Sequence, residues 1–274
     1  MYREPITTLA SVDASAVPES ATLIYANGFE TGVSDWDDYG GAFNATRVAS
    51  GTNGIVSAAG GFHAESSPSG SASRWGGYNF GAGAAVPTAF QEYTTSVAIY
   101  LNVTGGWANR TRFDFSSAIN RADGNFWRDF VFHAGFHTAA DHKGPGAGTK
   151  RFVISASNHS QPGDANAKNP DQGSIAIATT GWYTFEHHFY DNAGWLAVAM
   201  SIFDASRALV NTWTLRTAEP ISAIGGNCYG WFALNQFSTL AFDNAELRTH
   251  AERGKPAGAH HRFFPALRSQ CVAR

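Results

Sequence analysis

Three segments of the chain alternate aromatic and ionisable side chains with a period of two. They lie at residues 112–115, 128–133 and 184–190. Successive side chains of a β-strand point to opposite faces, so each segment is expected to form a strand with one apolar and one polar face. If the phenylalanines face a core, the other face carries Arg112, Asp114, Asp129, His133, Glu186, His188 and Tyr190. We expect these groups to share one concave sheet face, as a binding or catalytic cleft.

The composition favours one large all-β domain. Of the 274 residues, 43% are hydrophobic and 14% aromatic, and 29 are glycine, which suits many strands joined by tight turns. The formal net charge of -3 argues against a nucleic-acid-binding protein, which needs a basic stripe. The apolar runs are short and interrupted, so no membrane span is predicted.

The chain divides into three predicted parts. Residues 1–20 are read as a leader or linker, residues 21–249 as a β-sandwich domain and residues 250–274 as a flexible basic tail. The spacing of the strands and their turns predicts a two-sheet antiparallel β-sandwich of jelly-roll type. Predicted strands cover 95–103, 109–116, 126–133, 150–157, 173–178, 182–190, 195–204, 209–216, 229–235 and 239–248.

Export is the predicted fate of the chain. No apolar signal-peptide segment follows Met1. Aromatic-rich sandwiches with few lysines are often exported, however, and we therefore predict a secreted or extracellular protein. Cys228 and Cys271 could pair in an oxidising compartment, but the sequence leaves their pairing open.

The chain resembles the concanavalin A-like lectin/glucanase superfamily over residues 21–249. The resemblance rests on the opening Gly28-Phe29-Glu30 with Trp36, on the long segments 181–189 and 194–196, and on the closing segment 240–247. This superfamily includes lectins, glycoside hydrolases, polysaccharide lyases and binding modules, so the resemblance implies a polysaccharide partner and a fold, but no single reaction. The superfamily's Glu-x-Asp-x-x-Glu motif and the alginate-lyase series of Arg, His and Tyr motifs are absent here.

Two catalytic chemistries remain open for the predicted cleft. Asp114, Asp129 and Glu186 could supply the acid and the second carboxylate of glycoside hydrolysis, unless the two aspartates merely pair with Arg112 and Arg128. Alternatively, Arg112 and Arg151 could neutralise a uronate while His133, His188 or Tyr190 abstracts a proton in β-elimination. The same groups could also simply form a hydrogen-bonded polar face that holds sugar or water.

Other candidate sites concern metals and sugar stacking. Glu30 and Asp243 are candidate ligands of a structural calcium ion if the first and last strands lie side by side. No organic cofactor is predicted, and the strand spacing of His133 and His137 disfavours zinc. Candidates for stacking on sugars are Trp75, Tyr78, Trp107, Trp127, Trp195 and Trp231, of which Trp127 and Trp195 are preferred because their phase points them outward.

The sequence thus predicts a carbohydrate-active β-sandwich that binds, and by the density of its ionisable groups also cleaves, a polysaccharide. The reaction would be that of a glycoside hydrolase or a polysaccharide lyase. The alternative is a non-catalytic carbohydrate-binding or surface-structural module. The oligomeric state and the identity of the polysaccharide are not encoded in any motif.

Overall fold

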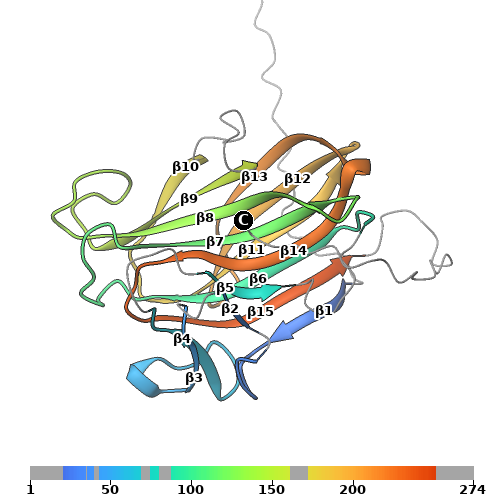
Figure 1. Ribbon diagram of the computed structural model, residues 1–274. Coiled ribbons are helices and arrows are strands. Elements are labelled where there is room, and N and C mark those ends of the chain that lie inside the picture. The colour runs from blue at the N-terminus through green and yellow to red at the C-terminus, as the bar shows by residue number, and fades with distance from the viewer. Residues whose placement is uncertain are drawn as a thin grey trace, which may run out of the picture.

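A computed structural model describes residues 21–34, 36–39, 43–68, 75–79, 88–160 and 172–250. In this part of the chain, two antiparallel β-sheets lie face to face (Figure 1). Sheet A has the strand order β13 (Leu209–Pro220), β12 (Trp195–Asp204), β11 (Gly181–Asn192), β6 (Tyr93–Leu101), β15 (Leu240–His250), β4 (Phe62–Ser66) and β3 (Ala45–Ala49). Strand β1 (Ala21–Asn27) also pairs with β15.

Sheet B forms the second layer. Its order is β10 (Gln172–Ile177), β9 (Arg151–Ser160), β8 (Phe126–His137), β7 (Arg112–Arg121), β14 (Ile224–Asn235), β5 (Trp75–Asn79) and β2 (Asp37–Tyr39). Two short 3₁₀ turns, η1 (Thr52–Gly54) and η2 (Ile221–Ala223), precede β4 and β14. The predicted all-β, two-sheet sandwich is therefore confirmed.

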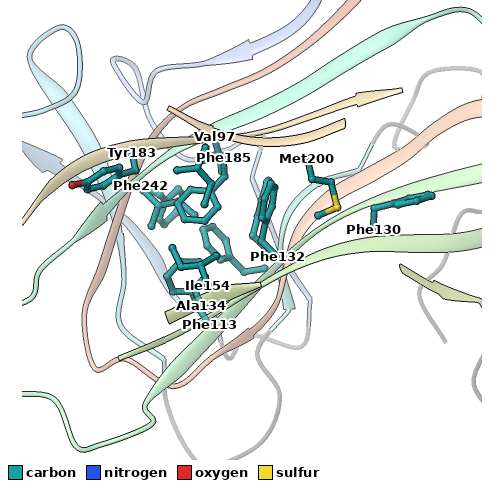
Figure 2. Packing of buried hydrophobic residues seen from close by; sticks show 14 of the residues in the cluster. Val97, Phe113, Phe130, Phe132, Ala134, Ile154, Tyr183, Phe185, Met200 and Phe242 are labelled. Carbon is teal, nitrogen blue, oxygen red and sulfur yellow. The ribbon is translucent and has the colours of Figure 1, made fainter. Parts of the chain in front are cut away.

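Phenylalanine side chains from both sheets fill the space between them. The ring of Phe185 on β11 meets Phe132 of β8 edge to face, with centroids 5.2 Å apart, and Phe113 of β7 at 5.8 Å. Phe130 and Phe189 form a further perpendicular pair at 5.4 Å. Figure 2 shows Phe113, Phe132 and Phe185 packed between the two layers. Edge-to-face contacts of this kind add about 0.5–1.5 kcal/mol per pair beyond the burial of their apolar area.

The limits of the described residues decide what can be said of the predicted leader, the predicted tail and the cysteine pair. Strand β15 continues to His250, which is buried at 3% exposure. Residues 1–20, the remainder of the predicted tail and Cys271 lie outside the described residues, whereas Cys228 is buried in β14. No helix in the described part of the chain is long and apolar enough to cross a membrane.

Candidate functional site

The predicted catalytic residues lie on two opposite outer faces of the sandwich. Because the phenylalanines of β7 and β8 pack against those of β11, the intervening polar residues of each strand point away from the other sheet. Asp114, Asp129 and His133 therefore face outward from sheet B, and Glu186, His188 and Tyr190 face outward from sheet A. The prediction of one shared cleft is wrong, because the core separates the two groups.

On sheet B, three side chains from neighbouring strands form a hydrogen-bonded relay. Asp114 Oδ1 lies 3.0 Å from His133 Nδ1, and His133 Nε2 lies 2.7 Å from Ser157 Oγ. The exposed guanidinium of Arg112 pairs with Asp114 at 3.5 Å. The strands β7, β8 and β9 are adjacent in the sheet, so alternation brings these side chains to one face.

Asp129 lies on the same face but has different partners from those expected. Its Oδ1 accepts hydrogen bonds from Ser116 Oγ at 2.5 Å and Tyr229 Oη at 2.9 Å. Burial raises the pKa of Asp129, and the two hydroxyl donors oppose that rise. Arg128 instead reaches Glu219 of sheet A, with Nη2 2.5 Å from Oε1. Of the two arginine–aspartate pairs considered from the sequence, only that of Arg112 and Asp114 forms.

On sheet A, each predicted residue contacts a neighbour on the outer face. His188 Nε2 lies 2.8 Å from Glu92 Oε1, and the ring of Tyr190 lies 5.2 Å from that of His188. Glu186 Oε2 lies 3.4 Å from Arg207 Nη2. Burial raises the pKa of Glu186 against the opposing effect of Arg207.

Arg151 has a structural role in place of the predicted contact with substrate. Its residue exposure is 0%, and its guanidinium donates to carbonyl oxygens of the 138–149 loop. The acceptors include Pro145 at 2.6 Å, Thr149 at 2.7 Å and Lys143 at 2.7 Å. Gly146 has a φ of 66° and passes so close that a Cβ there would lie 2.7 Å from Arg151 Cδ. The arginine thus holds the loop from inside and presents no cation to a ligand.

The two preferred stacking residues differ in accessibility. A bulge in the β7–β8 pairing places Asn120 opposite Phe126 and Ile119 opposite Arg128, which leaves Trp127 as the extra residue. Trp127 therefore packs against the interior cluster, with the Arg121 guanidinium 4.6 Å from its ring centroid. Its predicted outward orientation is wrong. Trp195 is 50% exposed at the start of β12, as its phase predicts.

The candidate calcium ligands lie near each other, with their carboxylates turned to one loop. Gly61 N donates to Glu30 Oε1 at 3.0 Å, and Ala59 N donates to Asp243 Oδ2 at 3.3 Å. Burial raises the pKa of Asp243 to about 6, and the charge of Glu30 adds to the rise. Within the described ranges, no group of three or more His, Cys, Asp or Glu side chains could hold a metal ion. Two carboxylates alone do not complete the six to eight oxygen ligands of calcium, so this site stays a prediction.

A pocket of about 290 Å³ opens at one end of the sandwich. It lies among the η1 loop, the loop that follows β6 and the turn before β15, next to Glu65 of β4. We call it the end pocket. Its lining residues are Asn53, Ile55, Glu65, Tyr100, Asn102, Trp107, Phe152, Phe237, Thr239, Leu240 and Ala241.

The carboxylate of the end pocket is held by a second relay. Glu65 Oε1 lies 3.4 Å from His63 Nε2, and His63 Nδ1 lies 3.0 Å from Ser57 Oγ. Asn53 Nδ2 lies 3.5 Å from each carboxylate oxygen of Glu65. His63 is fully buried and meets the ring of Trp182 edge to face at 5.9 Å. Glu65 is therefore a fixed acceptor at the pocket wall.

Most of the end pocket was not predicted from the sequence. Trp107 is one of the six residues predicted to stack on sugars, whereas Asn53, Glu65 and Tyr100 are not among the predicted site residues. The His63-x-Glu65 spacing on β4 was the available signal, since residues two apart on a strand share a face. The loops that close the pocket carry no such periodicity.

Comparisons with known proteins give a structural match of low similarity. No protein-family model matches the chain, and no curated protein matches it. A solved structure with a similar arrangement is the CBM2 module of Lactobacillus casei BL23 phage J-1 evolved Dit. It is 9% identical, with a TM-score of 0.45, and the match covers 84% of this chain and 96% of that chain. At this level of similarity, the function has to be inferred from the side chains of the chain itself.

Proposed function

We propose that this chain is a non-catalytic carbohydrate-binding β-sandwich protein that holds a sugar unit of a polysaccharide in the end pocket. The observation that carries the proposal is the composition of this pocket. Four aromatic residues line it, among them Tyr100 and Trp107, together with the amides of Asn53 and Asn102 and the carboxylate of Glu65.

This combination matches the chemistry of a sugar ring. A pyranose has apolar C–H faces, which pack on aromatic rings, and hydroxyl groups, which need directional donors and acceptors. Mostly apolar pockets with a few fixed polar groups are the usual form of small-ligand sites, and about 300 Å³ is at the lower end of their volume range. The size therefore favours one sugar unit over an extended chain segment.

Tyr100 and Trp107 are both held in place by the surrounding structure. Trp107 Nε1 donates to the carbonyl oxygen of Asn102 at 3.1 Å, and its ring meets Phe237 edge to face at 5.2 Å. Tyr100 on β6 meets Trp182 at 5.3 Å. A preorganised site of this kind loses little side-chain entropy when it binds a ligand.

The test is a polysaccharide panel examined by affinity electrophoresis, with reducing ends and unsaturated uronates measured in parallel. We expect retardation by at least one polysaccharide without release of product, and loss of that retardation in Tyr100→Leu. Trp195→Leu is the control, because Trp195 is exposed at the β11–β12 turn, outside the end pocket. Loss of binding only in Trp195→Leu would place the site elsewhere and overturn the proposal.

A second candidate function, ester hydrolysis, is favoured by the Asp114–His133–Ser157 relay. A hydroxyl bonded to imidazole Nε2 and a carboxylate bonded to Nδ1 are the arrangement that activates a serine nucleophile. Ser157 has 2% exposure, so an ester would reach it only if the outer face of sheet B opened. For this reason we rank this function second.

A fluorophosphonate probe tests this second candidate directly. Hydrolase chemistry requires labelling at Ser157 that is lost in Ser157→Ala and strongly slowed in His133→Ala. Ser155→Ala is the matched control, since Ser155 lies two residues away on the same strand and is also buried. An unlabelled wild-type protein would reduce the relay to a structural element of sheet B.

A further inference from the structure

The described lining of the end pocket contains an acidic side chain and no basic one. Among the described residues that line it, Glu65 is the single acidic side chain, and there is no lysine, arginine or histidine. The other polar lining groups are the neutral side chains of Asn53, Asn102 and Thr239 together with the phenol of Tyr100. None of the arginines predicted to bind a uronate, Arg112 and Arg151, lines this pocket.

The geometry keeps Glu65 at the pocket wall. Its side chain is 8% exposed, so its charge is only partly screened by water. A carboxylate can only accept hydrogen bonds, so His63 Nε2 must donate to it. In the neutral imidazole, Nδ1 then accepts from the Ser57 hydroxyl. Ser57 is fixed in turn, since its backbone N–H donates to Ser50 Oγ at 3.0 Å.

The protein donors leave part of the carboxylate for a ligand. Two ionised oxygens offer about four acceptor sites, whereas the described partners are the His63 imidazole and the Asn53 amide. The remaining acceptor sites can receive sugar hydroxyls or an ammonium group. A carboxylate on the ligand would instead face a partly buried charge of its own sign, which raises the cost of keeping both ionised.

We infer that Glu65 makes the end pocket selective for sugar units that carry no carboxylate, with a protonated amino sugar bound most tightly. This inference rests on the proposed function and adds the class of sugar. An ammonium–carboxylate hydrogen bond is about twice as strong as one between neutral groups. A neutral sugar offers only hydroxyl donors, and a uronate adds repulsion. The order of affinity is therefore amino sugar, neutral sugar, uronate.

Titration calorimetry with short oligosaccharides tests this order. The probes are trisaccharides of glucosamine, N-acetylglucosamine, glucose and glucuronate, at a pH at which the free amine is protonated. In Glu65→Gln we expect the dissociation constant for the glucosamine trisaccharide to rise about tenfold, as for loss of a hydrogen bond to a charged group. The affinity for the glucose trisaccharide should change little, and the affinity for the glucuronate trisaccharide should rise towards that for glucose.

Glu246→Gln is the matched control, since Glu246 on β15 pairs with Arg248 at 2.8 Å and does not line the pocket. This variant should keep the wild-type order. If Glu65→Gln does not fold, the salt dependence of the wild-type protein replaces it, because salt weakens the binding of the amino sugar far more than that of glucose.

The outcomes separate the two proposals. A wild-type protein that binds none of the trisaccharides and no polysaccharide of the panel overturns both the proposed function and the selectivity. A wild-type protein that binds glucuronate as tightly as glucosamine, or a Glu65→Gln variant that keeps the full order, overturns the selectivity alone. If Glu65→Gln and Glu246→Gln lose the same affinity for the glucosamine trisaccharide, the effect belongs to the overall charge of the protein. That result would also overturn the selectivity.

Discussion

The imidazole Nε2 of His187 lies 3.1 Å from the carbonyl oxygen of Phe130, so one hydrogen bond joins the two sheets through the middle of the core. His187 is fully buried, and the ring centroid of Phe132 lies 4.7 Å from that of the imidazole. Burial lowers the pKa of His187 to about 3, and the bond to Phe130 opposes that shift. The core therefore contains a base that stays neutral in the folded protein.

This buried base should make the protein sensitive to acid. In the unfolded chain His187 binds a proton near its ordinary pKa of 6.5, but in the fold it stays neutral down to about 3. The unfolded state thus binds more protons than the folded state. As the pH falls from 6.5 to about 3, the contribution of His187 to the free energy of unfolding decreases by about 1.4 kcal/mol per pH unit. Urea unfolding of the wild type and His187→Gln across this range measures the difference. Parallel pH profiles would contradict the prediction.

Arg151 should contribute strongly to stability. Arg151→Ala leaves several carbonyl oxygens of the 138–149 loop without their charged donor, and each hydrogen bond to a charged group is worth about 1.5–3 kcal/mol. We expect the free energy of unfolding to fall by at least about 3 kcal/mol, with faster proteolysis in the loop. Arg112→Ala is the control, because its side chain is 51% exposed and its 3.5 Å contact with Asp114 is worth at most about 1 kcal/mol. Equal losses in both variants would refute the role of Arg151.

The separation of the two outer faces predicts additive substitutions. Glu186 contacts Arg207 on sheet A, whereas His133 contacts Asp114 and Ser157 on sheet B. Glu186→Gln and His133→Ala should therefore change the free energy of unfolding independently, within about 0.5 kcal/mol. Asp114→Asn with His133→Ala should deviate from additivity by more than that, because these residues are bonded. A large coupling between Glu186 and His133 would contradict the two-face arrangement.

The calcium prediction for Glu30 and Asp243 is tested at a pH above about 6, where Asp243 is charged. A cation bound there would relieve the repulsion between the two carboxylates and would stabilise only the folded state. Added calcium should then raise the melting temperature, a chelator should reverse the rise, and Asp243→Asn should show neither effect. Superimposable melting curves with calcium and with chelator would rule out the site.

The sequence by itself determined the approximate positions of the long strands and, where no bulge interrupts them, the side of each strand that faces the core. Strand β12 begins and ends at the predicted residues 195 and 204, and Trp195 is exposed as its phase requires. The alternation in 112–115 and 128–133 likewise separates Phe113 and Phe132 from Asp114 and His133. These features are local, because the period of two belongs to the geometry of each strand.

Only the tertiary structure decided which strands share a sheet. Strand β11 joins sheet A, and β7 and β8 join sheet B, so residues of equal phase came to lie on opposite outer faces. A single bulge turned Trp127 inward. The η1 loop, the loop that follows β6 and the turn before β15 brought Asn53, Trp107 and Thr239 to one pocket. Within a strand, alternation determines which side chains face the core. The pairing of distant strands, which the burial of the whole core selects, determines which residues become neighbours.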